Sequence, residues 1–131
     1  MAKSVVLDST AVLAVLFDEP GAGQVIDLLQ GSLLSAVSLA EIHSRLLANG
    51  RPSAQAWNRV LSLGFEVVPF SDKQARLAGE LITRHARPAL SLVERACLAL
   101  AIECGATVYT TNRAWKNLLK PAANLDVVVI A

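Results

Sequence analysis

The chain has 131 residues, of which 53% are hydrophobic and 18% are charged. This composition excludes a disordered chain and predicts one ordinary domain, residues 1–131, that buries a single core. The 12 Lys and Arg residues nearly balance the 11 Asp and Glu residues, so the overall charge of +1 does not indicate nucleic-acid binding.

The apolar runs are short. The longest, 11–17 and 96–102, fall well below the ~20 residues that cross a bilayer. Lys3 is followed by only a brief apolar run before Asp8, so we expect no secretory leader and no membrane association. Cys97 and Cys104 lie too far apart along one expected helix to form a disulfide, and we expect core thiols in a reducing, cytoplasmic compartment.

Short β-branched segments alternate with longer segments of helical spacing along the whole chain. The expected strands are 4–8, 32–37, 65–70, 106–111 and 126–131. The expected helices are 10–19, 22–30, 39–48, 54–63, 72–86, 92–104 and 113–119. Strands that are joined by helices run parallel, so this order predicts an α/β fold around a parallel sheet of about five strands.

Polar side chains follow several of these strands. Asp8 ends the first strand, Glu41 lies about one helical turn after the second, and Asn112 follows the fourth. Because the carboxyl ends of parallel strands share one edge, where open α/β sheets bind ligands, we expect these three side chains to converge. Glu94 is harder to place, because two helices separate the third strand from the fourth.

The same residues also fit a purely structural role as helix caps. Three segments have the pattern of a capping box, namely 38–41, 71–74 and 91–94. Asp8 or Ser9 fits a cap of the first helix, and Asn112 fits a cap of the helix that follows it. Taken singly, each residue is more often a cap than a ligand.

The combination favours a metal site, because caps have no reason to gather at one sheet edge. Carboxylates that lie together need raised pKa values or a cation. Their hard oxygen atoms suit Mg²⁺ or Mn²⁺, and the corresponding chemistry is metal-assisted hydrolysis of a phosphodiester.

Other α/β classes lack their signatures here. The turn after the first strand reads DSTAVL and contains no glycine, which excludes the G-x-G-x-x-G dinucleotide motif. A phosphate-binding loop ending in Gly-Lys-Ser/Thr is absent as well. Thr10 stands where a phosphatase of the haloacid type has its second Asp.

Four segments, VVLDSTAVLAVLFDEPGA, SAVSLAEIHSRL, LSLVERACLALA and VYTTNRAW, together resemble the PIN-domain ribonucleases, specifically the small toxins of VapBC-type toxin–antitoxin pairs. The resemblance implies a three-layer α/β/α sandwich and an acidic site that binds Mg²⁺ or Mn²⁺ and cleaves RNA. Carried onto this chain, the site residues are Asp8, Glu41 and Glu94, with Asn112 at the usual fourth acidic place. It also implies a homodimer and a cognate antitoxin protein that blocks the acidic pocket within a toxin–antitoxin hetero-oligomer.

Two positions depart from the family pattern. The late motif usually reads Gly-Asp where this chain has Val93-Glu94, and Asp is usual where it has Asn112. Glu94 keeps the charge on a longer side chain, whereas Asn112 keeps only a carbonyl oxygen as a ligand. The alternative function is therefore a catalytically weak PIN domain that serves as an antitoxin-binding co-repressor module.

The remaining candidates surround these four residues. Ser9 and Thr110 or Thr111 resemble family positions that bond to ligands or water, although turn and cap roles fit equally well. Arg95 directly follows Glu94, so it is a candidate contact to RNA phosphate, with a surface ion pair as the alternative.

A basic stretch follows Asn112. Arg113, Lys116 and Lys120 lie on one short expected helix and are candidates for contacts to the RNA backbone. We interpret Trp57 and Trp115 as packing residues rather than as platforms for stacking bases.

Overall fold

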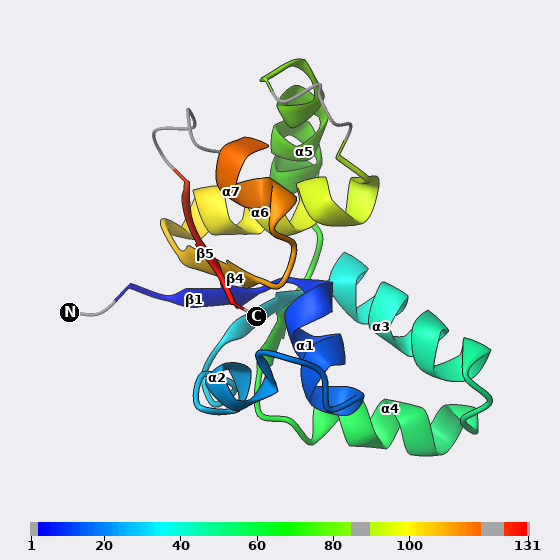
Figure 1. Cartoon of the computed structure of the whole chain (residues 1–131). Coiled ribbons are helices and arrows are strands. Elements are labelled where there is room, and N and C mark those ends of the chain that lie inside the picture. Colours follow the sequence, from blue (N-terminus) through cyan, green and yellow to red (C-terminus); the bar gives the residue numbers. More distant parts are fainter. Residues whose placement is uncertain (1–2, 85–89, 119–124, 131) are drawn as a thin grey trace.

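The computed structural model describes residues 3–84, 90–118 and 125–130. Within them, five strands form one sheet in which every neighbouring pair is parallel, in the order β3-β2-β1-β4-β5 (Figure 1). The strands are β1 (Val5–Leu7), β2 (Leu33–Ser35), β3 (Glu66–Val68), β4 (Thr107–Thr110) and β5 (Asp126–Val129). The predicted parallel α/β sheet is confirmed.

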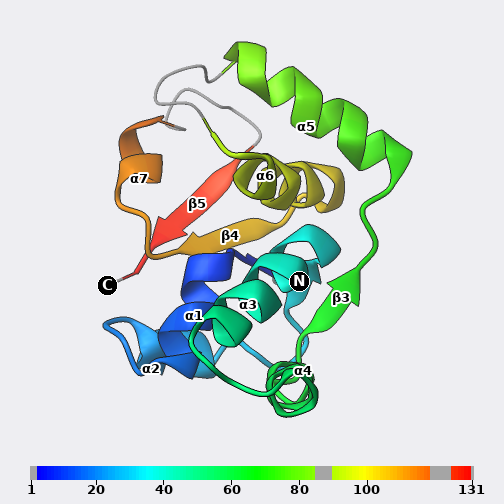
Figure 2. The ribbon, with the colours of Figure 1, turned by 90° about the vertical axis from the view of Figure 1, so that its right-hand side faces the viewer.

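Helices cover both faces of this sheet. They are α1 (Ser9–Leu16), α2 (Ala22–Ile26), α3 (Ala36–Ala48), α4 (Ser53–Leu61), α5 (Asp72–Arg84), α6 (Leu92–Cys104) and α7 (Ala114–Leu118). Helices α1 to α4 lie on one side and α5 to α7 on the other, which confirms the three-layer arrangement (Figures 1 and 2). Among the described residues, no helix is both long and apolar enough to cross a membrane. Positions 85, 86, 119 and 131 of the expected elements lie outside the described residues.

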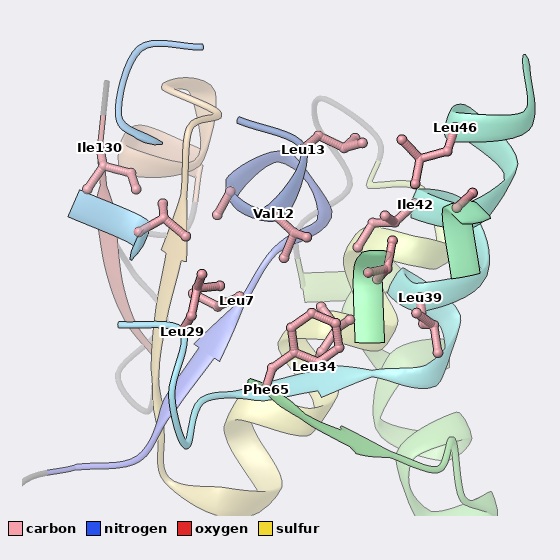
Figure 3. Close-up of a cluster of buried hydrophobic side chains, with 14 residues drawn as sticks. Leu7, Val12, Leu13, Leu29, Leu34, Leu39, Ile42, Leu46, Phe65 and Ile130 are labelled. Atoms are coloured by element: carbon pink, nitrogen blue, oxygen red, sulfur yellow. The ribbon is translucent and has the colours of Figure 1, made fainter. Parts of the chain in front are cut away.

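Two apolar clusters hold the central strand in place. Leu7 packs with Val12 and Ile42 under α1 and α3, in the cluster shown in Figure 3. Val6, the preceding residue, faces the opposite side and packs with Leu98 of α6. All five side chains are fully buried, and each such burial contributes roughly 1.5–3 kcal/mol. The strand that precedes Asp8 is therefore fixed from both faces.

Helix α3 begins three residues earlier than the sequence pattern predicts. Ser35 is its N-cap, with an extended backbone and a hydroxyl that accepts a hydrogen bond from the Val37 amide. The capping box expected at 38–41 is wrong, because Ser38 already lies inside the helix and a cap needs a non-helical backbone. Glu41 therefore does not take part in capping α3.

The other two capping boxes differ from each other. Ser91 and Glu94 form the complete reciprocal pair at the start of α6. At α5 only half of the motif forms: the Ser71 hydroxyl accepts from the Gln74 amide, while the Gln74 side chain donates to Glu103. Glu94 therefore helps to cap α6 by accepting a hydrogen bond from the Ser91 amide, in addition to any role in the candidate site.

The strand order reverses at β1. The chain moves from β1 outward to β2 and β3, and then returns to place β4 and β5 on the other side. Such a reversal opens a crevice at the carboxyl ends of the strands on either side of it. The residues that follow β1 and β4 are therefore the ones that the topology brings together.

Candidate active site

Asp8 directly follows β1 and is buried, with 3% of its surface exposed. Its amide extends the sheet by donating to the Tyr109 carbonyl. Although Asp8 stands at the N-cap of α1, its side chain makes no capping hydrogen bond. Oδ2 accepts instead from the hydroxyls of Thr10, at 2.6 Å, and Thr110, at 2.9 Å. A simple cap is therefore the wrong interpretation of Asp8.

The two threonine hydroxyls are held in place by the chain that follows β4. The Thr10 hydroxyl accepts from the Thr111 amide at 3.1 Å, and the Thr110 hydroxyl accepts from the Asn112 amide at 3.0 Å. Because a carboxylate accepts and does not donate, each hydroxyl directs its proton at Asp8, and the two hydroxyl oxygens also lie 3.2 Å from each other. The loop after β4 and the start of α1 thus form one hydrogen-bonded unit around the carboxylate.

The Asp8 carboxylate has no ion-pair partner in the part of the chain that the structure describes. Burial raises the pKa of Asp8 above its usual value, and the hydroxyls of Thr10 and Thr110 oppose that shift. The adjacent Ser9 hydroxyl is also buried and has no hydrogen-bond partner among the described residues. A bound cation would relieve both unfavourable features.

Glu94, at the start of α6, lies at the same edge of the sheet. Its Oε1 accepts from the Ser91 amide at 2.8 Å. Its Oε2 accepts from the indole nitrogen of Trp115 at 3.0 Å and from the side-chain nitrogen of Asn112 at 3.4 Å. The direction of α6, which the sequence could not settle, therefore places Glu94 beside the loop that follows β4.

Asn112 uses both ends of its amide. Its Oδ1 accepts from the Ala114 amide at 3.1 Å, which forms the turn into α7 and confirms the predicted cap role. Its Nδ2 faces Glu94. In this orientation Asn112 presents hydrogen atoms, rather than its oxygen, toward the neighbouring carboxylate.

The environment of Cys97 indicates that Asp8 and Glu94 lie in the same region of the structure. Its thiol is buried between α6 and β1, and burial raises its pKa well above the usual value. The negative charges of Asp8 and Glu94 raise that pKa further, so both carboxylates lie near the same sulfur atom. Cys104 is exposed, so the prediction of two core thiols is wrong for this residue.

Glu41 lies on α3 and is half-buried. No hydrogen bond or ion pair links it to Asp8 or Glu94 among the described residues. Across residues 3–84, 90–118 and 125–130, no three acidic, His or Cys side chains lie close enough together to hold a metal ion. Of the predicted ligand set, hydrogen bonds through the loop after β4 connect Asp8, Glu94 and Asn112, whereas no such bond among the described residues includes Glu41.

Arg95 has a structural role. Its guanidinium donates to the carbonyl oxygens of Ala78, at 3.1 Å, and Leu90, at 3.2 Å, and so ties α6 to α5. These bonds disfavour the predicted contact to RNA. Arg113 and Lys116 remain exposed near the site.

The sequence also predicts that Lys120 and Thr111 lie near the site. Lys120 lies outside the described residues. Thr111 is half-buried and contacts the site through its backbone amide.

Sequence reasoning missed the roles of Trp115 and Thr10. Trp115 is buried as predicted, but its indole N–H also serves Glu94. The strand register could have indicated the threonine contacts. Leu7 pairs with Tyr109, so the next residue on each strand, Asp8 and Thr110, must be neighbours.

The donor chemistry fits a hard divalent cation at two carboxylates. Asp8 offers a buried carboxylate that has no ion pair within the described residues, and Ser9, the next residue in the chain, has a buried hydroxyl without a described partner. Glu94 has roughly four acceptor positions, of which three are filled by the bonds described above. Asn112 fits poorly as a ligand in its present orientation, because its nitrogen faces Glu94 and its oxygen is directed at the Ala114 amide.

Fold and site together define a three-layer α/β/α domain with acidic side chains at the carboxyl edge of its sheet. The PIN domain family model matches residues 5–120, and the chain belongs to this family. A comparison with curated protein sequences found no match.

Solved structures with the same fold include several from the VapBC family of toxin–antitoxin systems. One match is the structure of VapBC2 from Rickettsia felis bound to a DNA fragment from the VapBC2 promoter. It has a TM-score of 0.74 and 20% sequence identity, and the match covers 97% of this chain and 98% of that chain. VapBC-5 from Mycobacterium tuberculosis matches with a TM-score of 0.65 and 18% identity over 98% and 99%. VapBC-1 from nontypeable Haemophilus influenzae matches with a TM-score of 0.70 and 16% identity over 95% and 96%. The expected resemblance to this group is confirmed at the level of the fold.

Proposed function

We propose that the protein is a metal-dependent endoribonuclease and the toxin of a type II toxin–antitoxin pair, acting in the cytoplasm. The observation that carries the proposal is the buried Asp8 carboxylate, which accepts from the hydroxyls of Thr10 and Thr110 and has no ion pair among the described residues. Membership in the PIN domain family supports nuclease chemistry. The neighbouring structures, which are toxin–antitoxin complexes, support an antitoxin partner.

Asp8 and Glu94 would hold Mg²⁺ or Mn²⁺, with Glu41 approaching from α3. When bound, the cation supplies positive charge against the RNA phosphate and makes water a stronger acid. Thr10 and Thr110 keep the Asp8 carboxylate in one orientation. Arg113 and Lys116 are exposed and would contact the RNA backbone.

A surface pocket borders this site. It has a volume of about 240 Å³ and is lined in part by Glu19 and Thr111. The Thr111 amide donates to the Thr10 hydroxyl, which in turn donates to Asp8, so two successive hydrogen bonds connect a residue that lines the pocket to the carboxylate. This position supports binding of an RNA segment across the edge of the sheet.

Exposed apolar side chains support protein partners. Trp57 and Leu61, one turn apart on α4, are 40% and 43% exposed, and Leu47 of α3 is 40% exposed. Apolar surface of this kind favours burial by another chain. We propose that an antitoxin and a second copy of this chain cover such surfaces, in a homodimer within a hetero-oligomer.

A specific observation favours the alternative of a weak enzyme that serves as an antitoxin-binding module. Asn112 replaces an acid and directs its N–H groups at Glu94. The Glu94 carboxylate already accepts hydrogen bonds from three donors, which reduces the number of lone pairs that are free to bind a metal ion.

The decisive experiment measures cleavage of a defined RNA pool by antitoxin-free protein, with Mg²⁺, with Mn²⁺ and with chelator. We expect cation-dependent cleavage that Asp8→Asn abolishes. Asp126→Asn is the matched control, because Asp126 also accepts a bond from a threonine but lies at the other end of its strand. Absence of cleavage with either cation, in protein that still binds its antitoxin, would favour the binding module.

A further inference from the structure

The Glu94 carboxylate is held by three donors that come from three different parts of the chain. The Ser91 amide belongs to the turn before α6, the Asn112 side chain to the loop after β4, and the Trp115 indole to α7. A helix cap alone would need only the first of these. The other two fix the carboxylate from the side of the candidate active site.

Trp115 is suited to positioning another group. It is 1% exposed and packs in the apolar cluster that includes Leu98 and Val108. A buried indole N–H needs an acceptor, and the acceptor here is the charged Oε2 of Glu94 at 3.0 Å. Charge-assisted bonds of this kind are stronger than neutral ones, so a rigid side chain holds a carboxylate in one place.

Asn112 complements Glu94 in a way that Asp could not. Its oxygen serves Ala114, a bond that Asp would also make, while its nitrogen faces Glu94 at 3.4 Å. An Asp at this position would direct an oxygen at the Glu94 carboxylate. Two such oxygens repel unless a cation lies between them.

We propose that Trp115 and Asn112 are positioning residues that hold Glu94 ready for the cation, and that the amide at position 112 is coupled to the glutamate at position 94. The inference rests on the proposed function, because it assumes that the acidic edge binds a divalent ion. Three of the roughly four acceptor positions of Glu94 are filled, so it would bind the cation through one oxygen. Restoring an acid with Asn112→Asp would then disrupt the metal-free site instead of repairing it.

The two tryptophans allow a direct test by NMR of the intact protein. Trp115 bonds to Glu94, whereas Trp57 is 40% exposed and packs against His43, so Trp57 is an internal control. In chelator, we expect Glu94→Gln to shift the Trp115 indole signal and to leave the Trp57 signal unchanged. We expect Mn²⁺ to broaden the Trp115 indole signal before that of Trp57.

The same spectra separate the two proposals. Broadening of the Ser9 amide signal beside Asp8, without broadening of Trp115, would overturn the positioning role and leave the metal site standing. Absence of broadening at both places would overturn the metal site itself. A Trp115 signal that ignores Glu94→Gln would overturn the hydrogen bond on which the inference depends.

Trp115→Phe keeps an aromatic ring in the apolar cluster, removes the N–H donor and leaves a small cavity. We expect the affinity for Mn²⁺, measured by calorimetry, to fall roughly 10-fold or more, as is typical when a partner that orients a ligand is lost. A purely structural role predicts a lower melting temperature with unchanged affinity, and that result would contradict the inference. Trp57→Phe is the matched control and should leave the affinity unchanged.

A double-mutant cycle tests the coupling. We expect Asn112→Asp to lower the melting temperature in chelator by roughly 3–6 °C, and Mg²⁺ to restore it. In a Glu94→Gln background the same change should have little effect, because Gln can donate to the new carboxylate. Equal losses in both backgrounds would show that positions 94 and 112 are independent.

Discussion

Thr110 donates a hydrogen bond to Asp8 at 2.9 Å across a sequence separation of 102 residues. Asp8 directly follows β1 and Thr110 is the last residue of the adjacent strand β4, and both side chains are buried. The bond therefore joins the two halves of the sheet at its carboxyl edge, where the candidate site lies.

We expect Thr110→Val to lower the free energy of unfolding at neutral pH by about 1.5–3 kcal/mol. The substitution keeps the shape of the side chain but removes a donor to a buried carboxylate, and it also removes the acceptor of the Asn112 amide. Urea unfolding in the presence of chelator measures the loss.

Thr107→Val is the matched control for this change. Thr107 lies on the same strand and donates to Asp126 at 2.8 Å, but the Asp126 side chain is 52% exposed. Water replaces the lost donor there, so we expect a loss of roughly 0.5 kcal/mol or less. Similar losses for the two variants would contradict a special role for Thr110.

Asp8 should make the metal-free protein less stable as the pH rises. Burial raises its folded-state pKa above the unfolded value of 3.8, so between the two pKa values the native state binds more protons than the unfolded chain. The free energy of unfolding therefore falls with increasing pH in that window. We expect Asp8→Asn to stabilise the protein at pH 7 by about 0.5–2 kcal/mol in chelator.

This stabilisation should shrink as the pH falls from the folded-state pKa toward 3.8, because the folded-state carboxylate is then protonated, and it should vanish below 3.8, where Asp8 is neutral in both states. Urea unfolding of both proteins at a series of pH values measures the difference. Saturating Mg²⁺ should reverse the order at pH 7, since an ion at 100 times its dissociation constant stabilises the wild type by about 2.7 kcal/mol. A difference that is independent of pH would contradict the role of burial.

Ser35 and Ser38 should differ in their contributions to stability. Ser35 caps α3, so Ser35→Ala should lower the free energy of unfolding by about 1 kcal/mol. The Ser38 hydroxyl is buried without a partner among the described residues, so Ser38→Ala should be neutral or stabilising. Thermal unfolding of the two variants compares them directly, and a larger loss for Ser38→Ala would place the cap where the sequence pattern predicts it.

This pair of serines also shows what the sequence could not specify. Both precede a helical pattern, and only the one followed by Glu at the third place matches a capping box. The true cap depends on where β2 ends, and that is set by its pairing with β3 in the folded sheet. Periodicity located the helix but did not determine its first residue.

In the candidate site, too, the sequence located some residues, whereas the placement of others depended on the packed structure. Asp8 and Asn112 could be placed at one edge because each directly follows a strand of a parallel sheet. The place of Glu94 depended on the direction of α6, which only the packed structure decides. Trp115 looked like a packing residue because its apolar surface dominates, and its single N–H donor has no signature in the sequence.

Glu41 and Glu94 should respond differently to loss of charge. Glu41 has no bond to another described acid and no cap role, so Glu41→Gln should change the free energy of unfolding by less than about 0.5 kcal/mol. Glu94 accepts from Ser91 and Trp115, so Glu94→Gln should lower it by about 1.5–3 kcal/mol in chelator.

Both variants should lose RNA cleavage by roughly 100-fold or more if both carboxylates act in catalysis. Cleavage assays and urea unfolding on the same preparations separate the two effects. Glu66→Gln is a control, because Glu66 is exposed on the edge strand β3 and should affect neither property. Full cleavage by Glu41→Gln would remove Glu41 from the proposed site and leave Asp8 and Glu94 as its acids.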